Sequence, residues 1–434
     1  MHFLNTRQIR QSIVLLLMLI WVLCPAETPR YSIEKKDNQW QLFQNGSSFY
    51  IKGAVGWSHY DVLEAYGANS VRTQAKKELL DKAHEHGFTA RAGLPVRGER
   101  NGMDWADPKM VAKQKERVLD RVREFKDHPA VMLWNVGNEL DWIPPGVPHH
   151  PDLWQRLNDL AKAIKAVDPH HPVMTVVGSG RFEKKIQRIM QDCPDIDLLG
   201  INTYGDIAEV TQQARQFWNR PYIIAEWGPT GHWQVPKTMW GAPVEQTSTE
   251  KAHVIFDRYQ NIILQDRKHC LGSYVFYWGE KQETTHTWYG LFRDGLITES
   301  IDVMHFLWKD SWPQNRAPAV LNVIIDEFVD EKAVLLNPGQ TCQAQAFCYD
   351  SDYDSLTFVW DIRPEVEVPE DSYAGGGEEP AKPIPGLFTD SHARRVRFQA
   401  PDKNGAYRLF VQITDGHGHA GYANVPFYVG TWSK

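Results

Sequence analysis

The feature that most constrains the fold is a regular alternation of apolar runs and amphipathic segments up to about residue 312. Strands are predicted at 49–57, 67–73, 87–96, 131–140, 172–178, 196–204, 222–228 and 271–278, and helices at 74–86, 108–126, 152–167 and 301–308. Eight such βα units fill about 265 residues, and about 250 is typical of a closed barrel of eight parallel strands. The expected fold class is therefore α/β, with a (β/α)8 TIM barrel.

Two of the predicted strands end in a carboxylate. Residues 131–140, VMLWNVGNEL, are apolar enough to be buried on both faces and then turn polar at Asn138 and Glu139. Residues 222–228, YIIAEWG, repeat this design and present Glu226. Because the carboxyl ends of barrel strands meet at one face, where active sites lie, we expect paired carboxylates there.

Beyond residue 312 the pattern changes to alternating strands without helices, predicted at 343–349, 356–362, 396–398, 406–413 and 423–429. We divide the chain into a signal peptide at 1–26, an N-terminal segment at 27–47, the barrel at 48–312, a linker at 313–318 and a small all-β domain at 319–434. The simplest architecture for the last is an Ig-like β-sandwich. It shows no obvious exposed aromatic stripe, so we expect it to pack against the barrel and not to bind glycan independently.

The N-terminus has the pattern of a secretory signal. Arg7 and Arg10 precede an apolar run at 13–23 that is too short to span a bilayer, and small residues precede a cleavage site before Glu27. We expect a secreted or periplasmic protein with no membrane span in the mature chain. Acylation of Cys24 as a lipoprotein and an uncleaved membrane anchor remain as alternatives.

Composition narrows the class of partner. With 42% hydrophobic residues the chain is globular, and its formal net charge of −7 offers no basic footprint for nucleic acid. The 17 Trp, 16 Tyr and 18 Phe residues supply flat apolar faces of the kind that sugar rings use, although large cores use them too.

The cysteines and acidic residues indicate neither a disulfide framework nor a metal centre. Cys342 and Cys348 fall in one predicted strand, roughly 20 Å apart, which is beyond disulfide reach. The spacings CxxC and HExxH do not occur. A run of aspartates at 350, 352 and 354 matches half of a calcium loop, but Ser355 replaces its glycine, which favours a tight turn. We expect neither metal nor cofactor.

A family resemblance rests on six residues at predicted strand ends: Arg72, Asn138, Glu139, Tyr204, Glu226 and Trp278. This combination resembles the retaining glycoside hydrolases of clan A. The resemblance covers the barrel and is closest to the TIM-barrel domain of glycoside hydrolase family 2 and similar β-glucanases.

The resemblance implies that Glu139 is the general acid/base and Glu226 the nucleophile. One carboxyl must be protonated to donate to the leaving oxygen and the other ionised to attack the anomeric carbon, so their environments must separate the two pKa values. Retaining enzymes hold the two carboxyls about 5 to 5.5 Å apart. The alternative is that both glutamates are salt-bridged barrel residues.

The other four matched residues would bind substrate or orient the glutamates. Arg72 would hold Glu226 anionic, and Tyr204 would donate a hydrogen bond to the same carboxylate. Asn138 would bind the sugar 2-hydroxyl, and Trp278 would form the floor of the subsite at the cleavage point. A structural ion pair is the alternative for Arg72, and packing is the alternative for Tyr204 and Trp278.

Aromatic loop residues would line an extended cleft. Sugar stacking and packing are equally open for those in or beside the predicted loops: Trp57, His59, Trp142, Trp233, Trp240, Trp288 and Tyr289. Two of these loops, 228–249 and 279–295, are long, and loops set substrate class in barrels. Long aromatic loops of this kind are suited to a cleft that binds several sugars of a polysaccharide.

These observations predict a secreted retaining β-glycosidase that hydrolyses a β-linked polysaccharide or oligosaccharide, with endo action on a β-1,3-glucan as the first candidate. Only about 20 residues of the mature chain precede the first barrel strand, unlike the usual family 2 pattern, so we expect endo rather than exo action. The alternatives are a β-glucan transglycosylase, a β-galactosidase-like exo-glycosidase and a non-catalytic carbohydrate-binding protein. The sequence does not indicate an oligomeric state.

Overall fold

A closed barrel of parallel strands forms the first domain of the computed structural model, which describes residues 30–142, 150–326, 332–366 and 378–432. The barrel strands are β4 (Ile51–Val55), β5 (Ser70–Gln74), β6 (Thr89–Gly93), β7 (Val131–Asn138), β8 (Val173–Gly178), β9 (Leu198–Asn202), β10 (Tyr222–Trp227) and β11 (Cys270–Phe276), neighbours in this order, with β11 pairing β4 to close the ring. The predicted TIM barrel is confirmed. The predicted signal peptide lies outside the described residues.

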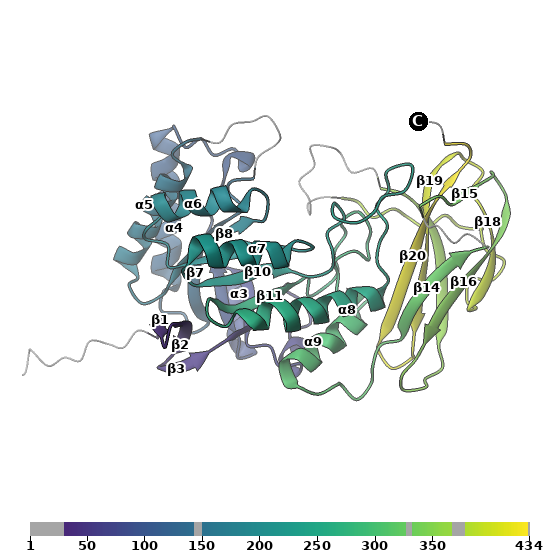
Figure 1. Cartoon of the computed structure of the whole chain (residues 1–434), viewed down its shortest axis with the longest axis horizontal. Coiled ribbons are helices and arrows are strands. Elements are labelled where there is room, and N and C mark those ends of the chain that lie inside the picture. Colours follow the sequence, from purple (N-terminus) through teal and green to yellow (C-terminus); the bar gives the residue numbers. More distant parts are fainter. Residues whose placement is uncertain (1–29, 143–149, 327–331, 367–377, 433–434) are drawn as a thin grey trace, which may run out of the picture.

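Helices follow each barrel strand and surround the barrel (Figure 1). They are α2 (Tyr60–Ala65), α3 (Lys77–Glu85), α4 (Pro108–Phe125), α5 (Leu153–Val167), α6 (Phe182–Asp192), α7 (Ile207–Gln213), α8 (Ser248–Arg258) and α9 (Glu299–Lys309). Shorter helical turns are η1 (Glu99–Asn101), η2 (Ala214–Trp218), η3 (Tyr259–Ile263) and η4 (Leu264–Asp266). Within the described ranges, none of the helices has both the length and the apolar character that a bilayer span requires.

Strand β7 shows why the apolar runs predicted the barrel. All its residues from Val131 to Gly137 are buried. Met132 and Leu133 join the apolar cluster inside the barrel, whereas Trp134 and Val136 join the larger cluster between the strands and the helices. A strand covered on both faces needs a continuous apolar sequence, which ends only where the strand reaches the open face of the barrel.

A three-stranded antiparallel sheet of β1 (Tyr31–Lys36), β2 (Gln39–Gln44) and β3 (Ser47–Phe49) covers the amino-terminal end of the barrel. Its Leu42 packs into the inner barrel cluster, and the amide of Trp40 donates to the carbonyl of Lys268, just before β11. The predicted turn at 45–46 joins β2 to β3, with φ positive at both residues. The carboxyl-terminal end of the barrel is thereby left for the site.

The C-terminal domain consists of two sheets around one apolar core. One sheet holds β14 (Ala319–Ile325), β16 (Thr341–Tyr349) and β18 (Arg395–Gln399), and the other holds β15 (Leu335–Leu336), β20 (Ala420–Val429), β19 (Gly405–Thr414) and β17 (Thr357–Pro364). A small hairpin of β12 (Phe292–Arg293) and β13 (Leu296–Ile297) lies in the barrel loop before α9. The predicted strands correspond to β16 to β20, and β14 and β15 were not predicted. The Ig-like assignment stays a prediction.

Strand β16 differs from expectation on its outer face. Cys342 and Cys348 both lie in it as free thiols that face the core. On the opposite face Phe347 is 40% and Tyr349 is 55% exposed, so the expectation of no exposed aromatic stripe is wrong. The two residues alternate with buried Cys348, a pattern that the sequence alone could have shown.

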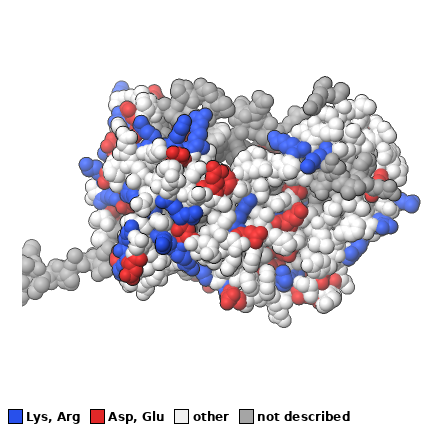
Figure 2. All heavy atoms as spheres, viewed as in Figure 1, with Lys and Arg blue, Asp and Glu red and all other residues white. Residues whose placement is uncertain are grey.

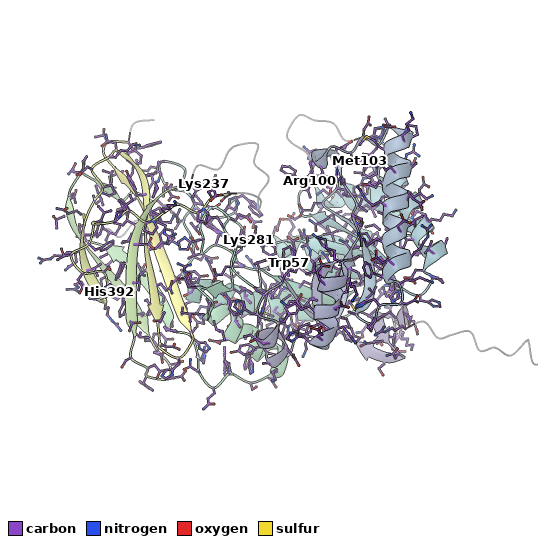
Figure 3. All side chains as sticks on the ribbon, turned by 180° about the vertical axis from the view of Figure 1, so that it is seen from behind. Trp57, Arg100, Met103, Lys237, Lys281 and His392 are labelled. Atoms are coloured by element: carbon purple, nitrogen blue, oxygen red, sulfur yellow. The ribbon has the colours of Figure 1, made fainter. Side chains whose placement is uncertain are left out.

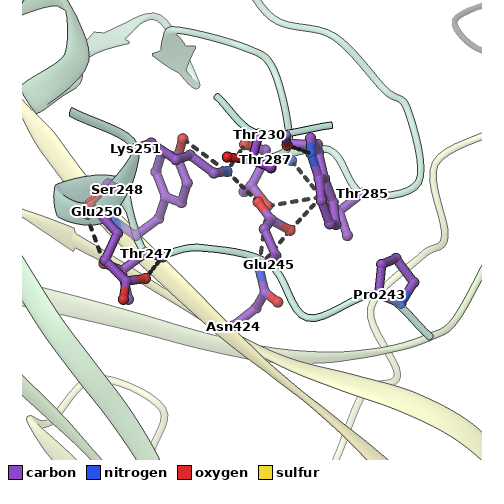
Figure 4. A network of polar contacts seen from close by, with 12 residues as sticks. Thr230, Pro243, Glu245, Thr247, Ser248, Glu250, Lys251, Thr285, Thr287 and Asn424 are labelled. Atoms are coloured by element: carbon purple, nitrogen blue, oxygen red, sulfur yellow. Dashed lines mark hydrogen bonds and ion pairs between the residues drawn. The ribbon is translucent and has the colours of Figure 1, made fainter. Parts of the chain in front are cut away.

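A buried ion pair of the barrel domain is hydrogen-bonded to the C-terminal domain (Figure 4). Lys251 of α8 donates to Glu245 at 2.5 Å and to the carbonyl of Thr287 at 2.7 Å. Thr285 and Asn424 of β20 also donate to Glu245, at 2.7 and 2.8 Å. Both charges are almost fully buried, so these bonds replace the water that each ion lost.

Stability at acid pH is expected to depend on His286, whose ring centroid lies 4.6 Å from that of Phe410 across the domain boundary. Burial, assisted by Arg293 and Arg363, lowers the pKa of His286 to about 3. In the unfolded chain His286 binds a proton below about pH 6.5, whereas in the folded chain it does so only below about pH 3. The free energy of unfolding therefore falls as the pH falls from about 6.5 to 3. From pH 7 to 4.5 this costs about 2 to 3 kcal/mol.

The His286→Gln variant, which cannot titrate there, should lose less stability over the same range. The urea midpoints of both proteins at pH 7 and 4.5 measure this difference. His392→Gln is a matched control on the exposed surface far from the domain boundary (Figure 3). Equal losses for the wild type and His286→Gln would contradict the assignment.

Candidate active site

The two predicted glutamates lie at the carboxyl-terminal ends of β7 and β10. Glu139 directly follows β7 with φ 49°, a left-handed conformation that few side chains adopt, and its amide donates to the carbonyl of Val176 at 2.8 Å. Glu226 is the last residue but one of β10. Arg72 comes from β5 and Tyr204 follows β9, so side chains from widely separated parts of the chain meet at the barrel mouth.

A chain of hydrogen bonds links the two glutamates. Arg72 donates through Nη1 to Glu226 Oε1 and through Nη2 to Asn138 Oδ1 at 3.1 Å. Asn202 Nδ2 donates to the same Asn138 oxygen at 3.4 Å and to Glu139 Oε1 at 2.7 Å. Tyr204 Oη donates to Glu226 Oε2 at 3.4 Å. Five predicted residues, Arg72, Asn138, Glu139, Tyr204 and Glu226, are thus brought together.

The two glutamates of the site have different electrostatic surroundings. Burial and the negative charge of Glu226 raise the pKa of Glu139, and the hydrogen bond from Asn202 and the charge of Arg100 oppose this only in part. Glu226 instead has the Arg72 guanidinium directly on its carboxylate. A carboxyl with a raised pKa therefore faces a carboxylate that is ion-paired with a guanidinium.

Arg72 and Tyr204 both remain donors to Glu226. Burial alone would lower the pKa of Arg72, but the Glu226 carboxylate outweighs it and raises that pKa. Burial and the charge of Glu226 raise the pKa of Tyr204 well above its ordinary value. The phenol therefore keeps its proton at neutral pH and can donate a hydrogen bond to the carboxylate.

Two residues of the site were missed by the sequence reasoning. Asn202 holds Glu139, and it could have been found as the polar residue that ends the apolar strand β9. Arg91 of β6 lies beside Arg72 on the neighbouring strand and is almost fully buried, with its guanidinium 5.7 Å from the centre of the Tyr274 ring. Burial and the neighbouring Arg72 lower the pKa of Arg91 to about 9.

An open cleft of about 1650 Å³ extends from the glutamates across the barrel mouth. Trp57, Trp142 and Trp233 line it and are 50%, 36% and 49% exposed, so three of the predicted aromatic residues lie on its surface. Figure 3 shows Arg100 and Lys281 on opposite sides of this cleft, with Trp57 between and below them.

Three predicted binding residues do not line the cleft. Trp278 is fully buried, stacks at 6.1 Å on Trp308 of α9 and donates to the carbonyl of His59, so its prediction as a subsite floor is wrong. The reason is that β11 ends at Phe276, so strand alternation does not continue to Trp278. Phe276 and Tyr277 line the cleft in its place.

His59 and Trp288 are packing residues, which was the alternative for both. His59 stacks on Phe292 at 3.9 Å. Trp288 is 1% exposed, donates to the carbonyl of Thr230 at 2.9 Å and lies in a small apolar cluster with Tyr204 and Tyr289. Trp288 therefore belongs to the apolar packing around Tyr204 of the site.

One group of carboxylates in the described part of the chain could hold a metal ion, and it lies in the C-terminal domain. Oxygens of Asp350, Asp354 and Asp415 lie within 4.8 Å of one another. Asp350 accepts from the amides of Asp352 and Asp354, so it forms the tight turn predicted from the sequence. Because Asp415 also accepts from Asn315 and His419, hydrogen bonds within the domain explain much of this group.

A closed (β/α)8 barrel with paired glutamates at the ends of two strands is the framework of a TIM-barrel glycoside hydrolase. The family profile "Glycosyl hydrolases family 2, TIM barrel domain" matches residues 58–303. The chain belongs to glycosyl hydrolase family 2, and the glycoside hydrolase assignment is confirmed.

Curated relatives are similar over the barrel. The chain is 26% identical to a beta-glucuronidase of Chlorocebus aethiops over 277 residues, 54% of this chain and 39% of that protein. It is 23% identical to a beta-glucuronidase of Paenibacillus borealis over 265 residues, 50% of this chain and 42% of that protein. This chain thus matches about two fifths of the length of these relatives.

The fold is also similar to a solved structure. An FMN-binding beta-glucuronidase from Facaelibacterium prausnitzii L2-6 superposes with a TM-score of 0.50 and 16% identity, over 93% of this chain and 59% of that one. At this level of identity the likeness concerns the fold alone.

Proposed function

We propose that this chain is a retaining β-glycosidase that cleaves internal bonds of a β-linked polysaccharide or oligosaccharide by double displacement. The observation that carries the proposal is the hydrogen-bonded chain from Glu226 through Arg72, Asn138 and Asn202 to Glu139. It couples an anionic carboxylate to a carboxyl with a raised pKa. Two such groups are what a retaining mechanism uses.

The mechanism follows from these roles. The Glu226 carboxylate attacks the anomeric carbon while the Glu139 carboxylic acid gives its proton to the leaving oxygen, so one C–O bond forms as the glycosidic C–O bond breaks. Ionised Glu139 then takes a proton from water, which attacks the glycosyl-enzyme and releases Glu226. The two inversions restore the β configuration. Asn138 would bind the 2-hydroxyl, an interaction that strengthens as positive charge develops on the sugar ring.

The cleft supports a substrate of several sugars. Its volume of about 1650 Å³ exceeds the range of about 300 to 1,000 Å³ that small-ligand pockets occupy. Trp57, Trp142 and Trp233 lie on its surface. We propose endo action, with a β-1,3-glucan backbone as the first substrate to test.

The test is a screen of purified protein against β-1,3-, β-1,4- and mixed-linked glucans, mannan, galactan and aryl β-glycosides. We expect a ladder of oligosaccharides from one polysaccharide, with the β anomer as the first product detected by proton NMR. Release of single sugars only would replace endo by exo action. Longer products at high oligosaccharide concentration would identify a transglycosylase, and no turnover of any substrate would favour a carbohydrate-binding protein.

A further inference from the structure

We propose that the glycan bound in the cleft carries acidic groups, carboxylate or sulfate, and that Arg181 and Lys184 at the start of α6 bind them. The proposal rests on the function proposed above and names the chemical class of its substrate. A β-linked backbone with acidic sugars or acidic substituents would be a substrate for the proposed glycosidase and would also supply the acidic groups.

The first observation is the charge of the cleft. Among its described lining residues, ten are Lys or Arg and five are Asp or Glu. The whole chain has the opposite balance, with 47 basic and 54 acidic residues. Glu139 and Glu226 belong to the acidic five and Arg72 and Arg91 to the basic ten, so the surface outside the cleavage point keeps the same basic excess. A cleft with this bias attracts an anionic ligand and repels a cationic one.

The second observation is that Arg181 and Lys184 have no anionic partner. Both are exposed in the cleft wall, and no carboxylate in the described ranges lies within 4.0 Å of either cation. The two neighbouring cations are neutralised: Lys185 pairs with Asp141 and Arg188 with Asp192, each at 2.7 Å. Of the four basic residues at 181–188, Arg181 and Lys184 are therefore left for a ligand.

The third observation is that these cations oppose the stability of their own helix. Arg181 is the N-cap of α6 and Lys184 lies in its first turn, where the helix dipole disfavours positive charge. Helix stability alone would favour acidic residues here, of which Glu183 is one, and an anionic ligand would offset the unfavourable placement of the two cations.

The position of these residues connects them to the site. A side chain at Gly178, the last residue of β8, would come within 3.2 Å of Glu139 Oε1, and Arg181 follows three residues later. Figure 2 shows Lys and Arg side chains gathered at the upper left of the molecule, the region where Figure 1 places α5 and α6. An extended glycan that passes Glu139 on this side would reach α6 with sugars away from the cleavage point.

Carboxylate and sulfate groups both suit this pair of residues. Arg offers a planar fork of donors that binds either oxyanion through two parallel hydrogen bonds, and Lys supplies a mobile point charge. Because both side chains are exposed, their attraction is screened by salt. Binding should therefore weaken as the salt concentration rises, whereas stacking on Trp57 or Trp233 should not.

The test is affinity electrophoresis of the Glu226→Gln variant, which keeps the cleft but should not consume its ligand. The native gels contain hyaluronan (carboxylate only), chondroitin sulfate (carboxylate and sulfate) or neutral laminarin, and dextran sulfate serves as an α-linked polyanion. We expect stronger retardation by at least one acidic β-linked glycan than by laminarin or dextran sulfate. The R181Q/K184Q change in this background should weaken that binding about tenfold, the effect of losing two partly exposed charge pairs.

The matched control is K113Q/K115Q, which removes two exposed charges from α4 outside the cleft. Retention of binding by this control and loss in R181Q/K184Q supports the proposal, and the single variant Lys184→Glu should lose binding as well. Equal weakening by both double variants, or the same retardation by laminarin, overturns it. Equal retardation by dextran sulfate overturns it too, since it would show attraction to any polyanion.

The two proposals can fail separately. If the wild type hydrolyses neutral glucans, and R181Q/K184Q and salt leave binding unchanged, the acidic substrate is wrong and the glycosidase function stands. If acidic glycans bind through α6 but the wild type turns over none of them, the binding site stands and the proposed catalytic function is wrong.

Discussion

Replacing Glu226 by Gln is expected to lower kcat/KM by about 10⁴- to 10⁶-fold, the range found when an enzyme loses its nucleophile. The amide cannot form the glycosyl-enzyme, and Arg72 loses the anion that it holds. Substrate binding should persist, because Gln keeps the size and most hydrogen bonds of the side chain. The measurement is kcat/KM on the best substrate from the screen, with glycan binding followed in the same preparation.

Sodium azide provides a sharper test of the two roles. In Glu226→Gly the azide ion can enter the space left by the side chain and attack the anomeric carbon. The leaving group departs with the proton of Glu139, and the product is an α-glycosyl azide. In Glu139→Ala azide would attack the glycosyl-enzyme instead and give the β product. The same azide product from both variants would contradict the assignment of roles.

Removal of Glu226 should also be visible at Glu139. The charge of Glu226 is the second cause, after burial, of the raised pKa of Glu139. In Glu226→Gln the pKa of Glu139 should fall, though burial keeps part of the elevation. A carbon-13 titration of the Glu139 carboxyl would show the direction. Glu116→Gln on the exposed face of α4 is a suitable control, since it removes a carboxylate that neither the cleft nor the core uses.

The sequence predicted those parts of the site that depend on strand ends. Glu139 and Glu226 were found because each terminates a run apolar enough to be buried on both faces, and the closed barrel must bring such ends together. Arg72, Asn138 and Tyr204 followed from the family resemblance, and the structure places all three in one hydrogen-bonded group with the glutamates.

The errors arose where a side chain leaves the strand pattern. Trp278 was predicted to face the cleft, but β11 ends two residues earlier and the ring turns to Trp308 instead. Trp288 was left open between stacking and packing, and its burial and its hydrogen bond to Thr230 show that it packs. Glu245 and Lys251 gave no signal, because charged residues are usually exposed and nothing local reveals that Asn424 of the C-terminal domain helps to bury them.

Replacing Lys251 by Met is expected to destabilise the protein by about 3 to 5 kcal/mol, because it leaves Glu245 buried without its cation. Burial alone would raise the pKa of Glu245, and Lys251 together with Arg408 lowers it. Without Lys251 the carboxyl must either remain an expensive buried anion or take up a proton. The measurement is the urea or thermal unfolding transition. The Lys113→Met variant on the exposed face of α4 should shift stability by no more than about 0.5 kcal/mol.

The same substitution should also lower activity. Glu245 lies in the same loop as Trp233, and it accepts a hydrogen bond from Thr285, which lies in the same loop as Lys281. Trp233 and Lys281 both line the cleft. The double variant E245M/K251M should recover much of the lost stability, since no unpaired charge remains in the core. Recovery would not be complete, because Asn424 and Thr285 then lack their acceptor. If the double variant were as unstable as Lys251→Met, the loss would come from packing, and the unpaired carboxylate could not be its cause.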